Sequence, residues 1–347
     1  MLHARQLLHA VQGVNARAAA WGALGAAGLA VAWSRARSED KMPDAIPPGA
    51  TERHRIVVVG GGSAGISVAA QLLRKLGSAN ADLAIVEPAD FHYYRPHFTT
   101  TAAGLVPYGH AFRPMARVMP RGARWIKAAA LHFDPEHNVL VLENGARVEY
   151  DFLVVATGMR MDMMQIKGLE AALEGDCGVS TIWDYRWVRK VWAGIRNMDH
   201  GVALFTQQYT LHSNVFALGD SANVPTSRTI AAITAQAPVL VQNLIINLQE
   251  EGHPASTSQL ARYDGYTSSP ILTKRGGLIL AEFRYDGVVK ETFPYFFDQS
   301  KEVSILYILQ TGFFPWAYWN LMLTGRWYGP RGLFEPRIKF VDTWAMP

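Results

Sequence analysis

Hydrophobic runs in the centre of the chain are separated by glycine-rich and polar segments, and their lengths predict alternating strands and helices. Residues 56–59 are apolar and β-branched, which is typical of a central strand in a buried parallel sheet. Residues 66–76 have a helical composition, and Gly77 stands where a helix commonly ends in a glycine cap. A second apolar run ends at Glu87 and predicts another strand. This strand–helix–strand order predicts an α/β fold.

The turn between the first strand and the helix is rich in glycine. Residues 60–65 read Gly-Gly-Gly-Ser-Ala-Gly and follow the G-x-G-x-x-G pattern. Such glycines permit a tight turn and a close approach to a pyrophosphate, which the N-terminus of the helix would bind. Glu87 follows about 20 residues later, where a carboxylate accepts the ribose hydroxyls of an adenosine and repels a 2′-phosphate. The pattern favours FAD or NAD over NADP, and the alternative is a glycine-rich turn that binds nothing.

Further apolar runs predict more strands. One covers residues 125–130, and a strand–turn–strand unit covers residues 139–150 with an Asn-Gly turn. A buried strand begins at residue 152 and ends in an Ala-Thr-Gly turn at 156–158. Another apolar run, at 214–218, ends in Gly-Asp. The strand that begins at residue 152 thus leads into a turn of small residues.

Residues 91–98 form an aromatic stretch directly after the second predicted strand. His92 and His97 within it could suggest a metal, but neither cysteines nor a carboxylate cluster accompany them. We interpret the stretch as an aromatic loop packed near the cofactor, and we expect no metal site.

Composition and charge exclude several classes of protein. The chain is 49% hydrophobic, which supports a real core. Cys177 is the one cysteine, so an internal disulfide and a CxxC site are excluded. The formal charge is +4, but residues 1–38 contain four arginines and no acidic residue. The rest of the chain is therefore neutral and lacks the basic surface of a nucleic-acid-binding protein.

The first residues have the composition of a targeting segment. Residues 1–40 contain arginine, are rich in alanine and have no acidic residue before Glu39, which predicts a transit peptide for mitochondrial import. A signal peptide or a retained N-terminal anchor is the alternative, because residues 18–33 are uncharged. Residues 41–54, with several prolines, predict a linker.

The glycine turn, the distant acid, the Ala-Thr-Gly strand end and the Gly-Asp strand end together resemble the flavoprotein disulfide reductase superfamily, in which such elements bind FAD. A finer resemblance is to mitochondrial-type sulfide:quinone oxidoreductases. The stretches that carry it are residues 57–88, 125–128, 156–158, 214–236, 263–268, 281–283, 297–302 and 318–320.

This resemblance implies an α/β fold with a Rossmann-like FAD-binding domain and a C-terminal membrane-associating helical region. It implies an enzyme of the mitochondrial inner membrane that oxidises sulfide and passes electrons through FAD to ubiquinone, with a small sulfur acceptor as a further partner and a homodimer left open. The residues expected to bind FAD are Gly60, Gly62, Ser63, Ala64, Gly65, Glu87, Arg95, Lys127, Ala128, Ala156, Thr157, Gly158, Gly219, Asp220 and Arg228. Those expected to contact quinone are Phe283, Lys301, Phe314 and Tyr318.

The segment between the last two FAD-binding turns is short. The superfamily inserts a second nucleotide-type domain there, normally of about 100–150 residues, whereas this chain has only residues 159–218. We expect an internal deletion with a seam near Thr206 and Gln207. One of the family's two redox cysteines normally lies in the absent domain, and Ser221 holds the position of the other. A serine cannot form a disulfide or persulfide, and Cys177 is either a second catalytic candidate or an unremarkable thiol.

The C-terminal region has a long stretch without charged residues, at 303–325, in which aromatic residues are frequent. Gly312 and Pro315 predict a division into two short helices, each too short to span a membrane. With basic residues following, the stretch predicts a helical anchor lying in the membrane interface. The alternative is a core element or a dimer interface.

We therefore expect a transit peptide (1–40), a linker (41–54), a first FAD-binding part (55–165), an interdomain remnant (166–206), a second FAD-binding part (207–250) and a quinone and membrane region (251–347). Two other functions stay open. One is a membrane-bound type II NADH:quinone oxidoreductase, which is disfavoured because a second G-x-G-x-x-G is missing. The other is a truncated FAD-binding isoform without catalysis.

Overall fold

The computed structural model describes residue 43 and residues 46–159, 162–163, 166–175, 179–196, 215–222, 224–249, 260–274 and 276–333. The chain divides into two compact units, Met1–Asp40 and Lys41–Pro347, and all described residues belong to the second. The expected transit peptide, the expected seam at Thr206 and Gln207, and Cys177 lie outside the described residues.

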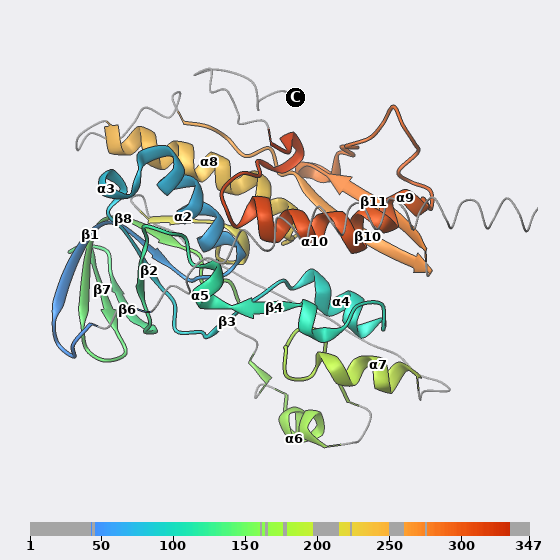
Figure 1. Cartoon of the computed structure of the whole chain (residues 1–347), viewed down its shortest axis with the longest axis horizontal. Helices are drawn as coiled ribbons and strands as arrows, with labels where there is room; N and C mark the ends of the chain where they lie inside the picture. The colour runs from blue at the N-terminus through green and yellow to red at the C-terminus, as the bar shows by residue number, and fades with distance from the viewer. Residues whose placement is uncertain are drawn as a thin grey trace, which may run out of the picture. The chain divides into compact units, whose positions relative to one another are not determined.

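A seven-stranded sheet lies on the left-hand side of the view in Figure 1. Its order is β5-β2-β1-β8-β7-β6, and β9 also pairs with β8. The pairs that join β5, β2, β1, β8 and β9 are parallel, while β6 and β7 run antiparallel to their neighbours. The predicted parallel α/β fold is thus confirmed. The strands are β1 (Thr51–Val59), β2 (Leu83–Val86), β5 (Arg124–Ile126), β6 (Ala130–Asp134), β7 (Val139–Leu142), β8 (Arg147–Val155) and β9 (Val215–Ala217).

Strand β8 joins two segments that the sequence predicts as separate strands. Its first part pairs with β7, with Arg147 opposite Val141, and its last part pairs with β9, with Leu153 opposite Val215. Asp151, between these parts, is exposed and accepts a hydrogen bond from Arg53 at 2.6 Å. The polar residue therefore faces water without interrupting the strand.

The remaining strand boundaries also differ from the prediction. Strand β1 begins at Thr51, because residues 51–54 pair with the start of β8, so the expected linker ends earlier than residue 54. The run 125–130 is divided between β5 and β6. A tight turn in which the Ala128 N–H bonds to the Ile126 carbonyl separates them.

Two long helices cover one face of the sheet. Helix α2 (Ser63–Leu76) packs against α8 (Ile230–Gln249), and their apolar residues form one core with those of β1 and β2. The Gly77 cap is confirmed, since its N–H bonds to the Leu73 carbonyl at 3.0 Å. Among the described residues α8 is the helix long and apolar enough to cross a membrane, but 56% of its most apolar window is buried, as a core helix would also be.

The other face of the sheet is covered by apolar residues of its own antiparallel part. Val57 and Val59 of β1 pack there with residues of β7 and β8. Short elements surround the sheet, and α7 packs against α4. They are α3 (Ser78–Ala81), β3 (Phe91–Tyr93), α4 (Pro96–Ala102), β4 (Phe112–Pro114), α5 (Met115–Val118), α6 (Leu169–Glu174) and α7 (Val188–Arg196), with 3₁₀ turns at Tyr108–His110, Gly219–Ser221, Tyr285–Gly287 and Gly329–Arg331.

The C-terminal region contains a hairpin and a helix. The hairpin pairs β10 (Thr267–Lys274) with β11 (Gly277–Phe283). The helix, which we call the tail helix, runs through α9 (Ser304–Ile308), a π turn (Leu309–Phe313), α10 (Phe314–Ala317) and a second π turn (Tyr318–Met322). The predicted break at Gly312 and Pro315 is therefore wrong. The Phe314 N–H bonds to the Leu309 carbonyl five residues back, and this wider turn makes room for the proline ring.

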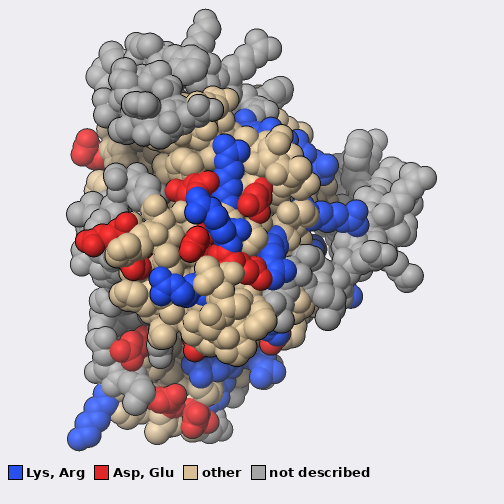
Figure 2. Space-filling model, turned by 90° about the vertical axis from the view of Figure 1, so that its left-hand side faces the viewer, with Lys and Arg blue, Asp and Glu red and all other residues tan. Residues whose placement is uncertain are grey.

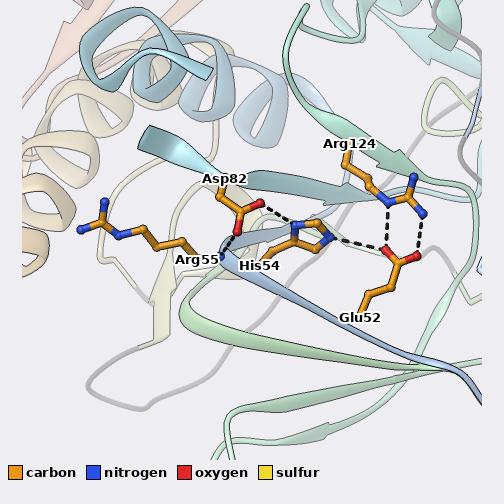
Figure 3. Close-up of polar contacts among 5 residues, drawn as sticks. All are labelled: Glu52, His54, Arg55, Asp82 and Arg124. Carbon is orange, nitrogen blue, oxygen red and sulfur yellow. Dashed lines mark hydrogen bonds and ion pairs between the residues drawn. The ribbon is translucent and has the colours of Figure 1, made fainter. Parts of the chain in front are cut away.

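Ion pairs link the starts of three neighbouring strands (Figure 3). Arg124 of β5 donates two hydrogen bonds to Glu52 of β1, at 2.9 and 2.6 Å. His54 Nδ1 lies 2.9 Å from Asp82 Oδ1, just before β2. Acidic and basic side chains are interspersed on the face of the molecule that contains these strand starts (Figure 2). This cluster holds the edge of the sheet opposite the glycine turn.

Candidate functional site

The glycine turn is packed so closely that two of its glycines cannot carry a side chain. Gly60 has φ +105°, and a Cβ there would lie 2.5 Å from the Ala156 carbonyl oxygen. A Cβ on Gly65 would lie 1.8 Å from the Gly60 carbonyl oxygen, because the first turn of α2 sits directly on the turn. Gly62, the N-cap of α2, is exposed and has open space where a Cβ would stand. The turn is therefore tight inside and open on the side where a phosphate would approach.

Glu87 is tied to the same turn from the end of β2. Its Oε2 accepts the Gly61 N–H at 2.6 Å, and its Oε1 accepts the Ala89 N–H at 2.7 Å. Burial raises the pKa of this carboxyl, and the two backbone N–H groups lower it in part. Because a carboxylate has about four acceptor positions, the ribose hydroxyls can still bind to the remaining ones.

Residues of β5 and the following turn lie beside Glu87. The Glu87 N–H bonds to the Ile126 carbonyl at 3.0 Å, and Trp125 Nε1 donates to the Glu87 carbonyl at 2.9 Å. Ala128 is buried, and the Lys127 ammonium pairs with Asp90. The expected FAD-binding residues Glu87, Lys127 and Ala128 are thus neighbours.

The two other expected turns lie at the same edge of the sheet. Val155 pairs with Val59 and with Ala217, so the chain leaves β1, β8 and β9 at the same level. Residues 157 and 158 are exposed there. The sheet therefore brings all three expected FAD-binding turns together.

Gly219 and Asp220 form the turn after β9. Gly219 has φ +65°, and its N–H donates to the buried Gln236 side chain at 2.7 Å. Burial raises the pKa of the Asp220 carboxyl, and the charges of Arg95 and Arg228 lower it in part. Arg95 is exposed. The expected residues Arg95, Asp220 and Arg228 thus form an electrostatic group of one carboxyl and two cations.

A side-chain network that sequence patterns do not reveal supports the glycine turn. His92 Nδ1 lies 2.8 Å from the Gly61 carbonyl oxygen, and its Nε2 lies 2.6 Å from the Tyr318 hydroxyl. The same hydroxyl lies 2.5 Å from Ser63 Oγ. Burial lowers the pKa of His92 to about 4, so the ring is neutral at pH 7. The aromatic loop, which the sequence predicts to pack near the cofactor, thus contacts the turn expected to bind that cofactor.

The tail helix packs closely against this network. Tyr318 is 3% exposed, and its ring lies 4.4 Å from that of Tyr94 and 5.0 Å from that of Trp319. The Arg113 guanidinium covers Trp319 at 4.3 Å from the ring centre. Tyr318 is therefore a core residue beside the glycine turn.

The other expected quinone residues lie on β11, on the loop after it and on α10, and the expected redox residue Ser221 lies in the turn after β9. Phe283 ends β11, Lys301 forms an exposed ion pair with Asp298 at 2.9 Å, and Phe314 begins α10. Ser221 follows Asp220 directly in the turn after β9. Within the described residues, acidic, histidine and cysteine side chains form no cluster that could hold a metal.

The residues present fit FAD. The open N-cap at Gly62 can receive a pyrophosphate, Glu87 lies at the adenosine end, and Asp220 with its two arginines lies at the end expected for the flavin. This order of chemical groups, along one edge of a parallel sheet, matches the order of groups in the dinucleotide.

The chain is similar to known oxidoreductases. The family model of pyridine nucleotide-disulphide oxidoreductases matches residues 54–196. The mitochondrial sulfide:quinone oxidoreductase of Dictyostelium discoideum is 29% identical over 447 residues, covering 89% of this chain and 97% of the relative. The mitochondrial sulfide:quinone oxidoreductase of Mus musculus is 24% identical over 410 residues, covering 81% of this chain and 89% of the relative.

A solved structure shares the fold. A chain in the cryo-EM structure of the Tetrahymena thermophila mitochondrial ATP synthase is matched with a TM-score of 0.62 at 14% identity, over 84% of this chain and 100% of that chain. At this identity the similarity concerns the fold alone. The family match over residues 54–196 and the similarity of most of the chain to mitochondrial sulfide:quinone oxidoreductases, together with the Rossmann-like sheet, support its assignment to the pyridine nucleotide-disulphide oxidoreductases.

Proposed function

We propose that this chain is a flavoprotein of the sulfide:quinone oxidoreductase type that binds FAD along the carboxyl edge of its parallel sheet. The observation that carries the proposal is that three separate turns, at residues 60–65, 156–158 and 219–220, meet at this edge. The homologues named sulfide:quinone oxidoreductases match most of the chain, which supports the same activity.

In this proposal the chain's own residues hold each part of FAD. Backbone N–H groups of residues 62–64 bind the pyrophosphate at the start of α2, and Glu87 accepts the ribose hydroxyls. Asp220 accepts hydrogen bonds from the ribityl chain, while Arg95 and Arg228 balance negative charge. FAD, when bound, supplies two-electron chemistry between a sulfur donor and a quinone.

The proposed reaction removes two electrons from sulfide and delivers them to ubiquinone, with a small acceptor taking the oxidised sulfur. Redox cysteines next to the flavin would perform the sulfur step, but Ser221 cannot do so. The alignment with the Dictyostelium relative extends over 447 positions, more than the 347 residues of this chain, so the relative has residues without a counterpart here. This supports an internal deletion, and the proposal places its seam near Thr206 and Gln207.

A second candidate function follows from Ser221 and from the residues of the relative that have no counterpart in this chain. The chain would bind FAD and associate with the membrane but would not turn over sulfide. Ser221 at the position of a redox cysteine favours this candidate. It shares the FAD site with the first candidate and differs from it only in the electron transfer.

The proposed location is the mitochondrial inner membrane, and the names of the homologues support the mitochondrial part of this proposal. Ile305, Ile308 and Phe313 of the tail helix are 40–60% exposed. Tyr295 and Phe296 before the helix are 95% and 81% exposed. These apolar side chains are suited to an interfacial anchor or a homodimer contact.

Anaerobic titration of the purified, FAD-loaded chain with sulfide separates the two candidates. Bleaching of the flavin band, followed by recovery with decylubiquinone, would establish the oxidoreductase. A spectrum that stays oxidised while FAD remains bound would establish the non-catalytic candidate. Bleaching by NADH in a parallel sample would instead support the NADH:quinone alternative.

A further inference from the structure

The tail helix reaches the glycine turn through a single hydroxyl group. Tyr318 Oη lies 2.5 Å from Ser63 Oγ, in the first turn of α2, and 2.6 Å from His92 Nε2. His92 continues the contact to the Gly61 carbonyl oxygen at 2.8 Å. Two residues of the turn, 61 and 63, are thus linked to a residue about 250 positions later in the chain.

The chemistry of the groups fixes the direction of each hydrogen bond in the series from Ser63 through Tyr318 and His92 to Gly61. A carbonyl oxygen only accepts, so His92 Nδ1 carries the proton that it donates to Gly61. The buried His92 is neutral at pH 7, and its Nε2 therefore accepts the proton of the Tyr318 hydroxyl. Tyr318 Oη then accepts from Ser63 Oγ. Each of the three side chains donates one hydrogen bond, and none is free to reverse while His92 is neutral.

The same peptide unit is held from both sides. The Gly61 N–H donates to Glu87 at 2.6 Å, while its carbonyl accepts from His92. A phosphate bound at residues 62–64 would fix the adjoining backbone in the position that Ser63 and Gly61 need to reach Tyr318 and His92. Binding at the turn and docking of the tail helix therefore require the same backbone geometry.

We propose that Tyr318 is a positioning residue that couples FAD binding at the glycine turn to docking of the tail helix, through the chain Ser63–Tyr318–His92–Gly61. This inference rests on the proposed binding of FAD. Coupling between two sites is reciprocal. Docking of the tail helix increases the affinity for FAD by a certain factor, and bound FAD shifts the docking equilibrium of the helix by the same factor.

The test compares the full-length protein with Tyr318→Phe, which removes the hydroxyl and keeps the ring. Tyr307→Phe is the matched control, because Tyr307 lies on the same helix and is half-buried in a different apolar cluster. Two quantities are measured for each protein: the dissociation constant for FAD, and backbone hydrogen exchange of residues 304–322 with and without FAD.

We expect FAD to slow exchange of residues 304–322 about 10-fold in the unmodified protein and in Tyr307→Phe, which corresponds to a typical coupling. In Tyr318→Phe we expect FAD to bind about 10-fold more weakly and to leave exchange of the helix unchanged. A purely structural role for Tyr318 would raise exchange equally with and without FAD. Ser63→Ala removes the hydrogen bond at the other end of this series and should also abolish the FAD-dependent protection. This variant carries the test if Tyr318→Phe fails to fold.

The outcomes separate this inference from the proposed function. If the unmodified protein binds no FAD, the proposed function and the coupling both fail. If it binds FAD but exchange of the helix does not respond, or if the response persists in both Tyr318→Phe and Ser63→Ala, the coupling alone is overturned.

Discussion

At the scale of single residues, the glycine turn is determined by contacts too short for any side chain. The Cα of Gly65 packs against the Gly60 carbonyl, and the Cα of Gly60 packs against the Ala156 carbonyl. These contacts bring α2 close to β1 and β8, which leaves the N-terminus of α2 at the carboxyl edge of the sheet. The ability to bind a phosphate therefore depends on two hydrogen atoms in place of side chains.

Replacing Gly65 by alanine should disrupt the turn. A Cβ 1.8 Å from the Gly60 carbonyl oxygen forces α2 away from the sheet, so we expect a loss of about 3 kcal/mol or more in the free energy of unfolding and loss of FAD binding. Urea unfolding and flavin absorbance measure the two effects. Gly109→Ala is the control, because Gly109 is exposed with open space around it, and its effect should stay within about 0.5 kcal/mol. Equal stability of both variants would contradict the packing described for the turn.

The buried histidines predict a dependence of stability on pH. Burial lowers the pKa of His92 and of His97 to about 4, below the usual 6.5. Between these values the unfolded chain binds protons that the folded chain does not, so the free energy of unfolding falls as the pH falls from about 6.5 towards 4. Each histidine contributes about 3 kcal/mol over this window.

His92→Gln should remove one of these two contributions and flatten the curve of unfolding free energy against pH. Identical curves for His92→Gln and the unmodified protein would show that His92 is accessible to protons in the folded state.

At the scale of elements, a buried carboxylate holds the C-terminal hairpin. Glu282 of β11 is 3% exposed and accepts hydrogen bonds from the Tyr266 hydroxyl, from the Thr292 N–H and hydroxyl at 2.7 Å each, and from Gln299 Nε2 at 2.7 Å. Burial is the main cause that raises the pKa of Tyr266, and the nearby Glu282 carboxylate raises it further. The network joins the hairpin to the loop that leads into the tail helix.

Glu282→Ala should therefore destabilise the C-terminal region by about 3 kcal/mol, because it leaves several buried donors without a partner. Limited proteolysis and urea unfolding would show this loss. Glu136→Ala, which removes an exposed carboxylate, should have little effect. A stable, protease-resistant Glu282→Ala protein would mean that this network does not hold the hairpin.

Elements that local patterns determine are the ones the sequence predicts well. The β1–α2–β2 unit follows from an apolar run, a glycine turn and the cap at Gly77, each within a few residues. For the longer strands the prediction differs from the structure where polar residues face water. The sequence predicts β8 as two strands separated at Asp151 and omits residues 51–54 from β1. The tail helix continues through Pro315 because π turns absorb the proline, and no local pattern announces such turns.

Contacts between distant segments explain what the sequence does not predict about the site. The expected FAD residues lie on three turns, and the parallel sheet alone brings these together. The support from Tyr318 comes from a residue 255 positions beyond Ser63, so its role at the turn depends on how the tail helix packs. Gln236, which holds Gly219, is likewise a buried amide whose partner only the fold reveals.

At the scale of the whole molecule, the largest apolar cluster of the described residues lies on one face of the sheet and contains residues of α2, α8 and the tail helix, while a second cluster covers the other face. The three turns expected to bind FAD lie at the carboxyl ends of the central strands. The same fold matches the full length of a solved chain. The chain thus has the fold of a complete solved chain, although it is shorter than the alignment with its Dictyostelium relative.

A bound cofactor should stabilise this whole unit. A ligand at 100 times its dissociation constant adds about 2.7 kcal/mol to the free energy of unfolding. We expect FAD to raise the midpoint of thermal unfolding, and Glu87→Ala, which loses the ribose contact, to weaken that rise. Adding NADPH in place of FAD serves as the control, because Glu87 repels a 2′-phosphate. A midpoint that is insensitive to FAD would argue against the site.

The visible absorption spectrum of the purified full-length protein, after gel filtration with added FAD, tests the central claim most directly. We predict a protein-bound flavin band that corresponds to about one FAD per chain and that disappears in Gly65→Ala. A folded protein that elutes without flavin would contradict the FAD site and with it the proposed function.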